Sequence, residues 1–183
     1  QYTPQEINHR LKHYFKFTFV REPIERMLSA YRNKFTERYN SYFHIRWGRD
    51  IIRRYRKHPD RSSLMYGHNV RFPEFVQYLL NTEVNQYNEH WRPYYQMCFP
   101  CMIKYDFIGK YESMSKDVDY VLDKTGLNKE ITFPRGYKHR KTSDLLQKYF
   151  VNISAEQIHK LWELYDVDYA LYNYPYPQIK PNV

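Results

Sequence analysis

The sequence predicts an α/β fold in which a mainly parallel sheet is flanked by helices. Two stretches, His13–Val20 and Met102–Gly109, have the length and the β-branched or aromatic content of strands. A stretch with helical spacing follows each of them, and alternation of strands with helices is typical of parallel sheets. Because the sequence contains no repeats, low-complexity blocks or internal linkers, we predict a single domain over residues 1–183.

A helix, a strand and a second helix are predicted at the start of the chain. In Thr3–Glu6, the threonine and glutamate can satisfy each other's backbone N–H groups at the start of a helix. Pro23 cannot continue a central strand but suits the start of a helix. The strand has one aromatic face, made by Phe15, Phe17 and Phe19. The helix after Pro23 has apolar residues at helical spacing, namely Ile24, Met27, Leu28, Tyr31 and Phe35.

Two helices and a loop are predicted between the strands. In Trp47–His58, apolar residues fall on one face and arginines on the other. Phe72-Pro73 opens the second helix, because proline is favoured in the first helical turn. Asn81–Pro100 is polar and contains prolines, so we predict a loop there.

Three helices are predicted after the second strand. Ser113 caps the first of them, and Gly126 ends it. Thr142 or Ser143 starts a short second helix. Ser154–Gln157 is another capping box, which begins the last helix, and the Pro-rich tail beyond that helix is predicted to be extended.

The chain is basic, with a net charge of +9, and 19% of its residues are aromatic. The segment Thr36–Arg71 holds nine Lys or Arg against three Asp or Glu. Such a field favours nucleic acid, anionic lipid or acidic glycan, although a solvated helix face is an equally open interpretation. No run of about 18 apolar residues could span a membrane. No signal peptide is visible at Gln1, and because the chain starts without Met we expect it to be a fragment.

The two cysteines stand as Cys98-Phe-Pro-Cys101. A thioredoxin-like motif would open a helix, whereas a predicted strand follows here, so a local disulfide or two buried thiols is favoured. A zinc site would need two more ligands, and His90 is the only candidate nearby, so we predict no metal.

The turn between the first strand and its helix is a candidate anion site. Backbone N–H groups and the positive end of the helix dipole meet there, and Arg21 offers a planar fork for phosphate. Ser29 falls about 140° from Ile24 on a helical wheel, away from the apolar stripe. The alternative is an arginine paired with Glu22 or Glu25 and a serine that faces solvent.

The run FVREPIERMLSAYRNKF resembles the 3′-phosphate-binding motif of the Golgi carbohydrate sulfotransferases. The resemblance continues through GRDIIRRYRK, FPEFVQYLL, NEHWRPYYQMCFPCMIKYDFIGKYESMSKDVDYVL and LYDVDYALYNY, and so covers most of the chain. It is greatest to the branch that makes chondroitin, dermatan and GalNAc 4-O-sulfates and a glucuronyl 3-O-sulfate. The resemblance implies a P-loop-like fold and 3′-phosphoadenosine 5′-phosphosulfate (PAPS) as the donor, whose 3′-phosphate Arg21 and Ser29 would bind.

The same resemblance implies a location and a missing part. The family's first strand and 5′-phosphosulfate loop, with its lysine, have no counterpart in these residues, so we expect the chain alone to be inactive. A lumenal domain on the Golgi membrane is implied, held by a type II anchor outside this sequence. The implied partner is a glycan acceptor, either a glycosaminoglycan or an N-glycan, and not nucleic acid.

Sulfuryl transfer needs a base near the acceptor hydroxyl. His90 is the first candidate, and its neighbour Trp91 could stack on a sugar ring; a structural loop histidine is the alternative. Glu112 follows the second strand, at the end where α/β sheets place ligands. Its alternative is a carboxylate at a helix start, paired with Lys110 or Lys116.

Basic side chains supply the remaining candidates. Arg140 and Lys141, in a loop before a helix start, could close over the nucleotide, although a solvated charge run is equally open. Asn152 heads an Asn-Ile-Ser sequon for N-glycosylation. Residues that could hold an acidic glycan are Arg53, Arg54 and Lys57.

Two rival functions stay open beside the enzyme. One is a basic, aromatic-rich module for nucleic acid, but RNA- or DNA-binding signatures are missing from the sequence. The other is a sulfotransferase-like domain that binds acidic glycans without catalysis.

Overall fold

The computed structural model describes residues 2–134, 142 and 145–179. The chain divides into two compact units. Unit 1 comprises Gln1–Glu22 and Tyr94–His139, and unit 2 comprises Pro23–Pro93 and Arg140–Val183. The single domain over the whole chain stays a prediction.

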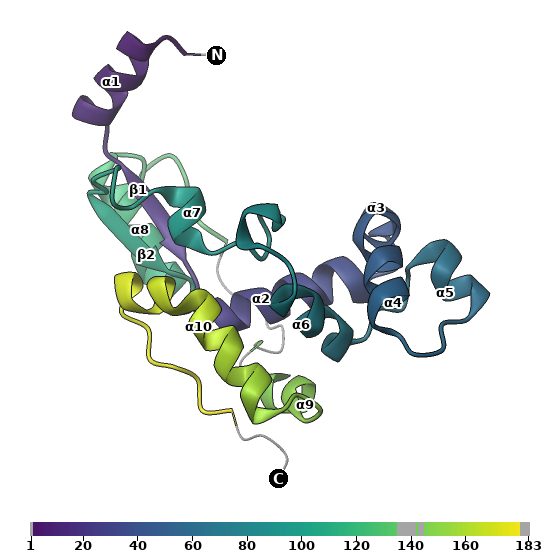
Figure 1. Cartoon of the computed structure of the whole chain (residues 1–183). Coiled ribbons are helices and arrows are strands. Elements are labelled where there is room, and N and C mark those ends of the chain that lie inside the picture. Colours follow the sequence, from purple (N-terminus) through teal and green to yellow (C-terminus); the bar gives the residue numbers. More distant parts are fainter. Residues whose placement is uncertain (1, 135–141, 143–144, 180–183) are drawn as a thin grey trace. The chain divides into compact units, whose positions relative to one another are not determined.

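Unit 1 contains the sheet (Figure 1). Its strands β1 (Phe17–Val20) and β2 (Phe107–Lys110) pair in parallel from end to end. Helix α8 (Met114–Lys124) follows β2 through the short turn η4 (Tyr111–Ser113) and contacts that strand. Parallel strands combined with helices confirm the predicted α/β class.

Both strands are shorter than the sequence predicted. The Thr3–Glu6 capping box forms as expected and begins helix α1 (Pro4–His13). This helix includes His13, the first residue of the first predicted strand. Helix α7 (Tyr94–Cys98) lies within the stretch that was predicted to be a loop, so that prediction is wrong there.

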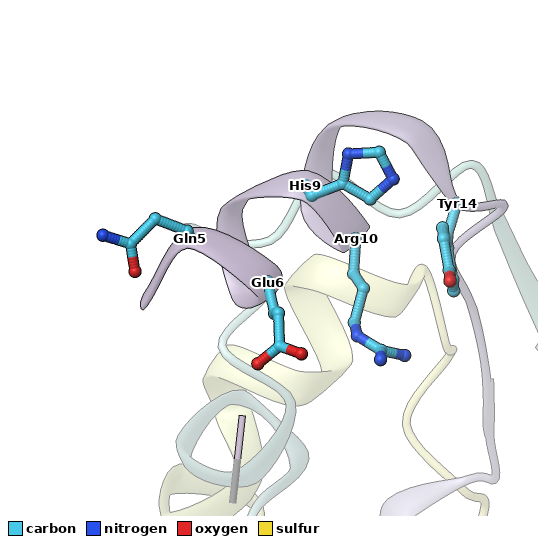
Figure 2. A pocket seen from close by; sticks show the side chains of 5 residues that line it. All are labelled: Gln5, Glu6, His9, Arg10 and Tyr14. Carbon is cyan, nitrogen blue, oxygen red and sulfur yellow. The ribbon is translucent and has the colours of Figure 1, made fainter. Parts of the chain in front are cut away.

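The helix α1 buries none of its residues. Figure 2 shows a shallow pocket of about 290 Å³ along it, lined by Gln5, Glu6, His9, Arg10 and Tyr14. The guanidinium carbon of Arg10 lies 3.8 Å from the centroid of the Tyr2 ring and 5.4 Å from that of Tyr14. The pocket therefore consists of side chains from one exposed helix and its flanking residues, and it holds none of the predicted site residues.

Unit 2 is built from helices in its described part. They are α2 (Pro23–Tyr31), the π-helical turn η1 (Arg32–Thr36), α3 (Ser41–Phe43), the π-helical turn η2 (His44–Gly48), α4 (Arg49–Tyr55), α5 (Arg61–Tyr66), α6 (Phe72–Leu80), η3 (Val84–Gln86), α9 (Leu146–Phe150) and α10 (Ala155–Tyr172). The last helix, α10, contacts both α2 and α6 (Figure 1).

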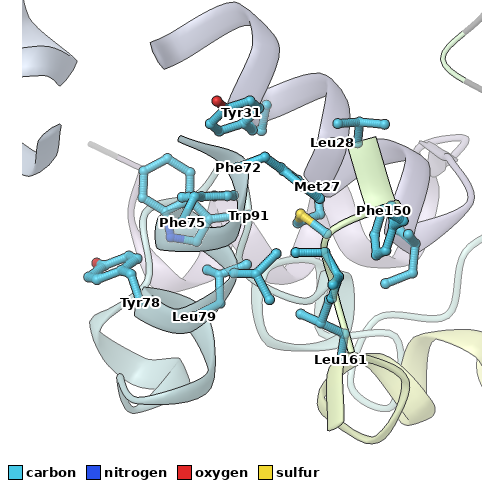
Figure 3. Packing of buried hydrophobic residues seen from close by; sticks show 14 of the residues in the cluster. Met27, Leu28, Tyr31, Phe72, Phe75, Tyr78, Leu79, Trp91, Phe150 and Leu161 are labelled. Carbon is cyan, nitrogen blue, oxygen red and sulfur yellow. The ribbon is translucent and has the colours of Figure 1, made fainter. Parts of the chain in front are cut away.

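The hydrophobic core lies in unit 2 and contains many aromatic rings (Figure 3). The ring centroid of Phe75 lies 5.3 Å from that of Phe35 and 5.5 Å from those of Tyr31 and Trp91. The rings of Phe75 and Trp91 meet edge to face, an arrangement that adds attraction to the gain from burial. This core fixes α2, α6 and α10, the elements around the loop that carries His90.

Three further elements differ locally from the predictions. Helix α4 begins at Arg49 rather than Trp47, because a π-helical turn precedes it. Helix α5 was not predicted; its cap is Asp60, whose carboxylate accepts from the backbone of Ser63 at 2.8 Å. Helix α9 begins at Leu146, later than expected.

Candidate functional site

The turn after β1 contains only Arg21 and Glu22 before α2 begins. The backbone N–H of Glu22 donates to the Glu112 carboxylate, with 3.0 Å between N and Oε1. The guanidinium carbon of Arg21 lies 4.4 Å from the centroid of the Tyr111 ring. Because neighbouring parallel strands end at the same edge of the sheet, these residues meet there. The structure thus brings together Arg21 and Glu112, two of the predicted site residues.

Glu112 has a structural contact that the sequence analysis did not predict. Its carboxylate accepts the backbone N–H of Glu22, the residue that directly precedes α2 in the chain. The turn that carries Glu112 is itself tied to α8, since the backbone of Lys110 donates to Asp117 at 2.7 Å. Glu112 therefore holds the turn at Arg21.

Ser29 belongs to unit 2, whereas Arg21 belongs to unit 1. Ser29 is half-buried on α2, between the buried residues Leu28 and Ala30. Residues Arg140 and Lys141, predicted to bind the donor, lie outside the described residues.

His90 lies in a partly buried environment in unit 2. Its ring centroid is 5.5 Å from that of Phe43, and its Nε2 is 3.8 Å from Oε1 of Glu89. Burial lowers the pKa of His90, and the positive charge of Lys34 lowers it further. An imidazole that is uncharged at neutral pH can accept a proton, which is the property that a general base needs.

The loop around His90 is held by Arg26, a residue to which the sequence analysis gave no role. Its two terminal nitrogens donate to the carbonyl oxygens of Glu89 and Arg92, each at 2.6 Å. Arg92 in turn donates to the carbonyl of Tyr87 at 2.6 Å. Since all these acceptors are backbone carbonyls, no side-chain pattern in the sequence could have revealed them.

Trp91 does not fit its predicted role in sugar stacking. The side chain is fully buried, with its ring centroid 5.7 Å from that of Trp47, and its backbone carbonyl accepts from the Tyr165 hydroxyl at 2.6 Å. A large apolar ring next to a polar loop gains more from the core than from solvent. The prediction that Trp91 contacts a sugar is therefore wrong.

The predicted glycan cluster separates into two parts. Arg53 and Arg54 are exposed and both pair with Asp50, at 4.0 Å and 3.0 Å between nitrogen and oxygen. Lys57 instead lines a cavity together with Asn152, which is exposed. Lys57 thus differs from Arg53 and Arg54 in lining this cavity.

Cys98 and Cys101 are not bonded to each other in the structure. Cys98 is half-buried at the end of α7 and Cys101 is exposed, so neither the disulfide nor the pair of buried thiols is observed. Among the described residues, His, Cys, Asp and Glu side chains do not gather in threes as metal ligands would. In the same part of the chain, every helix is too short or too polar to cross a membrane.

Parallel strands that end beside an arginine, just ahead of a helix, are typical of α/β proteins that bind phosphate groups. Comparison with known proteins identifies the family. The sulfotransferase family matches residues 1–175, and the chain belongs to that family, as the resemblance predicted.

The relatives that it matches are carbohydrate sulfotransferases. The chain is 48% identical to carbohydrate sulfotransferase 11 of Mus musculus over 181 residues, which is 97% of this chain and 51% of that protein. It is 43% identical to carbohydrate sulfotransferase 14 of Danio rerio, over 95% of this chain and 47% of that protein. It is 42% identical to carbohydrate sulfotransferase 8 of Homo sapiens, over 94% of this chain and 42% of that protein. The chain thus spans about half the length of the curated relatives it matches, and no solved structure matches it significantly.

Proposed function

We propose that this protein transfers the sulfuryl group of PAPS to a hydroxyl of an acidic or GalNAc-containing glycan. The observation that carries the proposal is the sulfotransferase family match over residues 1–175, which includes Arg21 and the helix start beside it. Since the chain spans about half the length of its relatives, transfer is proposed for the whole protein. Binding of the donor's 3′-phosphate is proposed for the residues present here.

In this proposal Arg21 and Ser29 bind the 3′-phosphate. A guanidinium can donate two parallel hydrogen bonds to phosphate oxygens, and a serine hydroxyl can donate a third. The start of α2 adds the positive end of a helix dipole next to Arg21. Arg140 and Lys141 stay candidates for the same nucleotide.

His90 acts as the base in the proposed reaction. The acceptor oxygen attacks sulfur, and a new S–O bond forms while the bond from sulfur to the donor's phosphate oxygen breaks. The hydroxyl proton passes to the imidazole, whose lowered pKa keeps it ready to accept. Glu89, 3.8 Å away, can then pair with the imidazolium. Glu112 is the weaker candidate, because its carboxylate is already bonded to the turn.

The acceptor and location belong to the same proposal. A chondroitin or dermatan type of glycan suits the basic surface of the chain, since its repeating units carry carboxylates and sulfates. A Golgi lumenal location would allow N-glycosylation at Asn152, which is exposed.

The test is calorimetric titration of the chain with adenosine 3′,5′-bisphosphate (PAP), the product nucleotide. Arg21→Ala should weaken PAP binding by about 1.5–3 kcal/mol, the range for a hydrogen bond to a charged group. Arg53→Ala is the matched control, because Arg53 is an exposed arginine paired with Asp50, and it should bind PAP like the unaltered chain.

Two results would contradict the proposal. One is a folded chain, with cooperative thermal unfolding, whose PAP affinity is the same with and without Arg21. The other is a salt-sensitive preference for oligonucleotides over PAP, which would favour a nucleic-acid-binding module.

A further inference from the structure

Unit 2 contains a cavity of about 560 Å³, and none of its lining residues belongs to the loop that carries His90. It lies between the end of α4, the start of α6 and the turn before α10. Tyr55, Lys57, Arg71 and Asn152 are among the residues that line it. This volume is within the range of about 300–1,000 Å³ that is typical of small-molecule sites.

A buried ion pair also contributes to the lining. Arg56 and Glu74 have side chains that are only 7% and 9% exposed, and two nitrogen–oxygen distances of 2.8 Å join them. Oε2 of Glu74 also accepts from the backbone of Arg71 at 2.8 Å. Both carboxylate oxygens are thus used, and the negative charge of Glu74 is cancelled by Arg56.

Two further cations remain at the cavity. Lys57 and Arg71 are both exposed, and within the described part of the chain neither side chain has an ion-pair partner. Helix α6 starts directly after Arg71, so the positive end of its dipole adds to the same field. The lining therefore has an excess of two positive charges, contributed by side chains that can still pair with an anion.

We propose that this cavity binds the carboxylate or sulfate group of an acidic oligosaccharide. Lys57 and Arg71 would pair with the anionic group, and the ring of Tyr55 offers an apolar face to a sugar. The choice of a glycan, rather than another anion, rests on the proposed function.

The cavity gives the predicted glycan contacts a definite location. Arg53 and Arg54 share Asp50 on the exposed surface of α4, whereas Lys57 joins Arg71 at a concave surface. The two pairs of cations allow a matched comparison, because replacing either pair by glutamine removes two positive charges from the same unit.

The experiment is calorimetric titration of the chain with a chondroitin sulfate hexasaccharide at constant ionic strength. The chain is made in bacterial cells that do not glycosylate Asn152. Lys57→Gln with Arg71→Gln should weaken binding at least about tenfold, as expected when charge-assisted contacts are lost. Arg53→Gln with Arg54→Gln should weaken it less than about threefold. Equal losses in both variants, or no loss in the first, would overturn the proposal.

Inorganic sulfate serves as the competing probe. We expect it to bind at least about tenfold more weakly than the hexasaccharide, because it lacks the sugar that Tyr55 would contact. If it binds as tightly, the cavity is a plain oxyanion site and the glycan proposal fails. The PAP titration separates this failure from that of the proposed function, because replacing Lys57 and Arg71 should leave PAP affinity unchanged.

Discussion

The two units of the chain differ in how many apolar side chains they bury. Every residue of the buried hydrophobic cluster belongs to unit 2. In the described part of unit 1, the buried hydrophobic residues are only Val20 and Val121. Large side chains that are exposed in unit 1 include Ile7, Leu11, Phe17, Met102 and Ile108.

Unit 1 is instead held by carboxylates that accept backbone N–H groups. The Asp106 carboxylate accepts from the backbone of Lys16 at 2.8 Å. In the same way Glu112 accepts from the backbone of Glu22 at 3.0 Å, and Asp117 from that of Lys110 at 2.7 Å. Burial of apolar area gives a rigid frame, whereas exposed polar contacts give local structure that opens at low free-energy cost. His90 therefore lies in the unit that contains the hydrophobic core, whereas hydrogen bonds such as that from Glu22 to Glu112 hold the turn with Arg21.

The largest difference between the units should appear when one phenylalanine of each is truncated. Phe75→Ala removes a fully buried ring from unit 2 and should destabilise the chain by about 3–5 kcal/mol. Phe17→Ala removes a ring from unit 1 that is 45% exposed, and should cost less than about 1 kcal/mol. Urea unfolding monitored by circular dichroism measures both. Similar losses of stability in the two variants would mean that apolar packing stabilises unit 1 as much as unit 2.

A smaller difference is expected between two ion pairs. Glu74→Gln leaves the buried guanidinium of Arg56 without its counter-charge, which should cost about 3 kcal/mol. Asp106→Asn breaks the pair with Lys16 in unit 1, where the Asp106 side chain is 40% exposed, and should cost much less. Thermal unfolding of the two variants decides the order. A larger loss from Asp106→Asn would reverse the comparison.

The elements that the sequence predicted best have strong local signals. The capping boxes that start α1 and α10 lie in Thr3–Glu6 and Ser154–Gln157, and both form. Helix α6 begins at Phe72-Pro73 as expected. Helices α5 and α7 were missed because each is short and lacks a clear apolar stripe, so that contacts distant in sequence decide them.

The site could be predicted where topology alone decides the outcome. Parallel strands end at one edge, and this brings Glu112 close to Arg21. Trp91 was assigned wrongly, because its burial depends on Phe35, Phe75 and other residues far away in the sequence. Arg26 was missed since its acceptors are backbone carbonyls, whose positions a sequence does not give.

The smallest expected effect concerns pH, because the two units should lose stability in different pH ranges. His44 is buried in η2, and its Nε2 has no hydrogen-bond partner within the described residues. Burial lowers the pKa of His44 below its ordinary value of 6.5, and the charge of His68 adds to this. In unit 1, hydrogen bonds from Lys16 lower the pKa of Asp106 below 3.8.

The sign of each effect follows from which state binds more protons. Unfolded His44 takes up a proton more readily than folded His44, so its contribution to stability is full above pH 6.5 and is lost as the pH falls through the lower folded pKa. Asp106 contributes above pH 3.8 and loses its contribution only at more acid pH. Unit 2 should therefore weaken first as the solution is acidified.

Melting temperatures at pH 7.5 and pH 5.5 test this order. The unaltered chain should melt a few degrees lower at the acid pH, the scale expected for a small loss of stability in a protein of this size. His44→Phe should reduce that difference without removing it, because burial also lowers the pKa of His90. His159→Gln, at an exposed position on α10, should melt with the same pH dependence as the unaltered chain. If His44→Phe retains the full difference, the pH response arises elsewhere, and acid sensitivity no longer distinguishes the packed unit from the unit held by carboxylates.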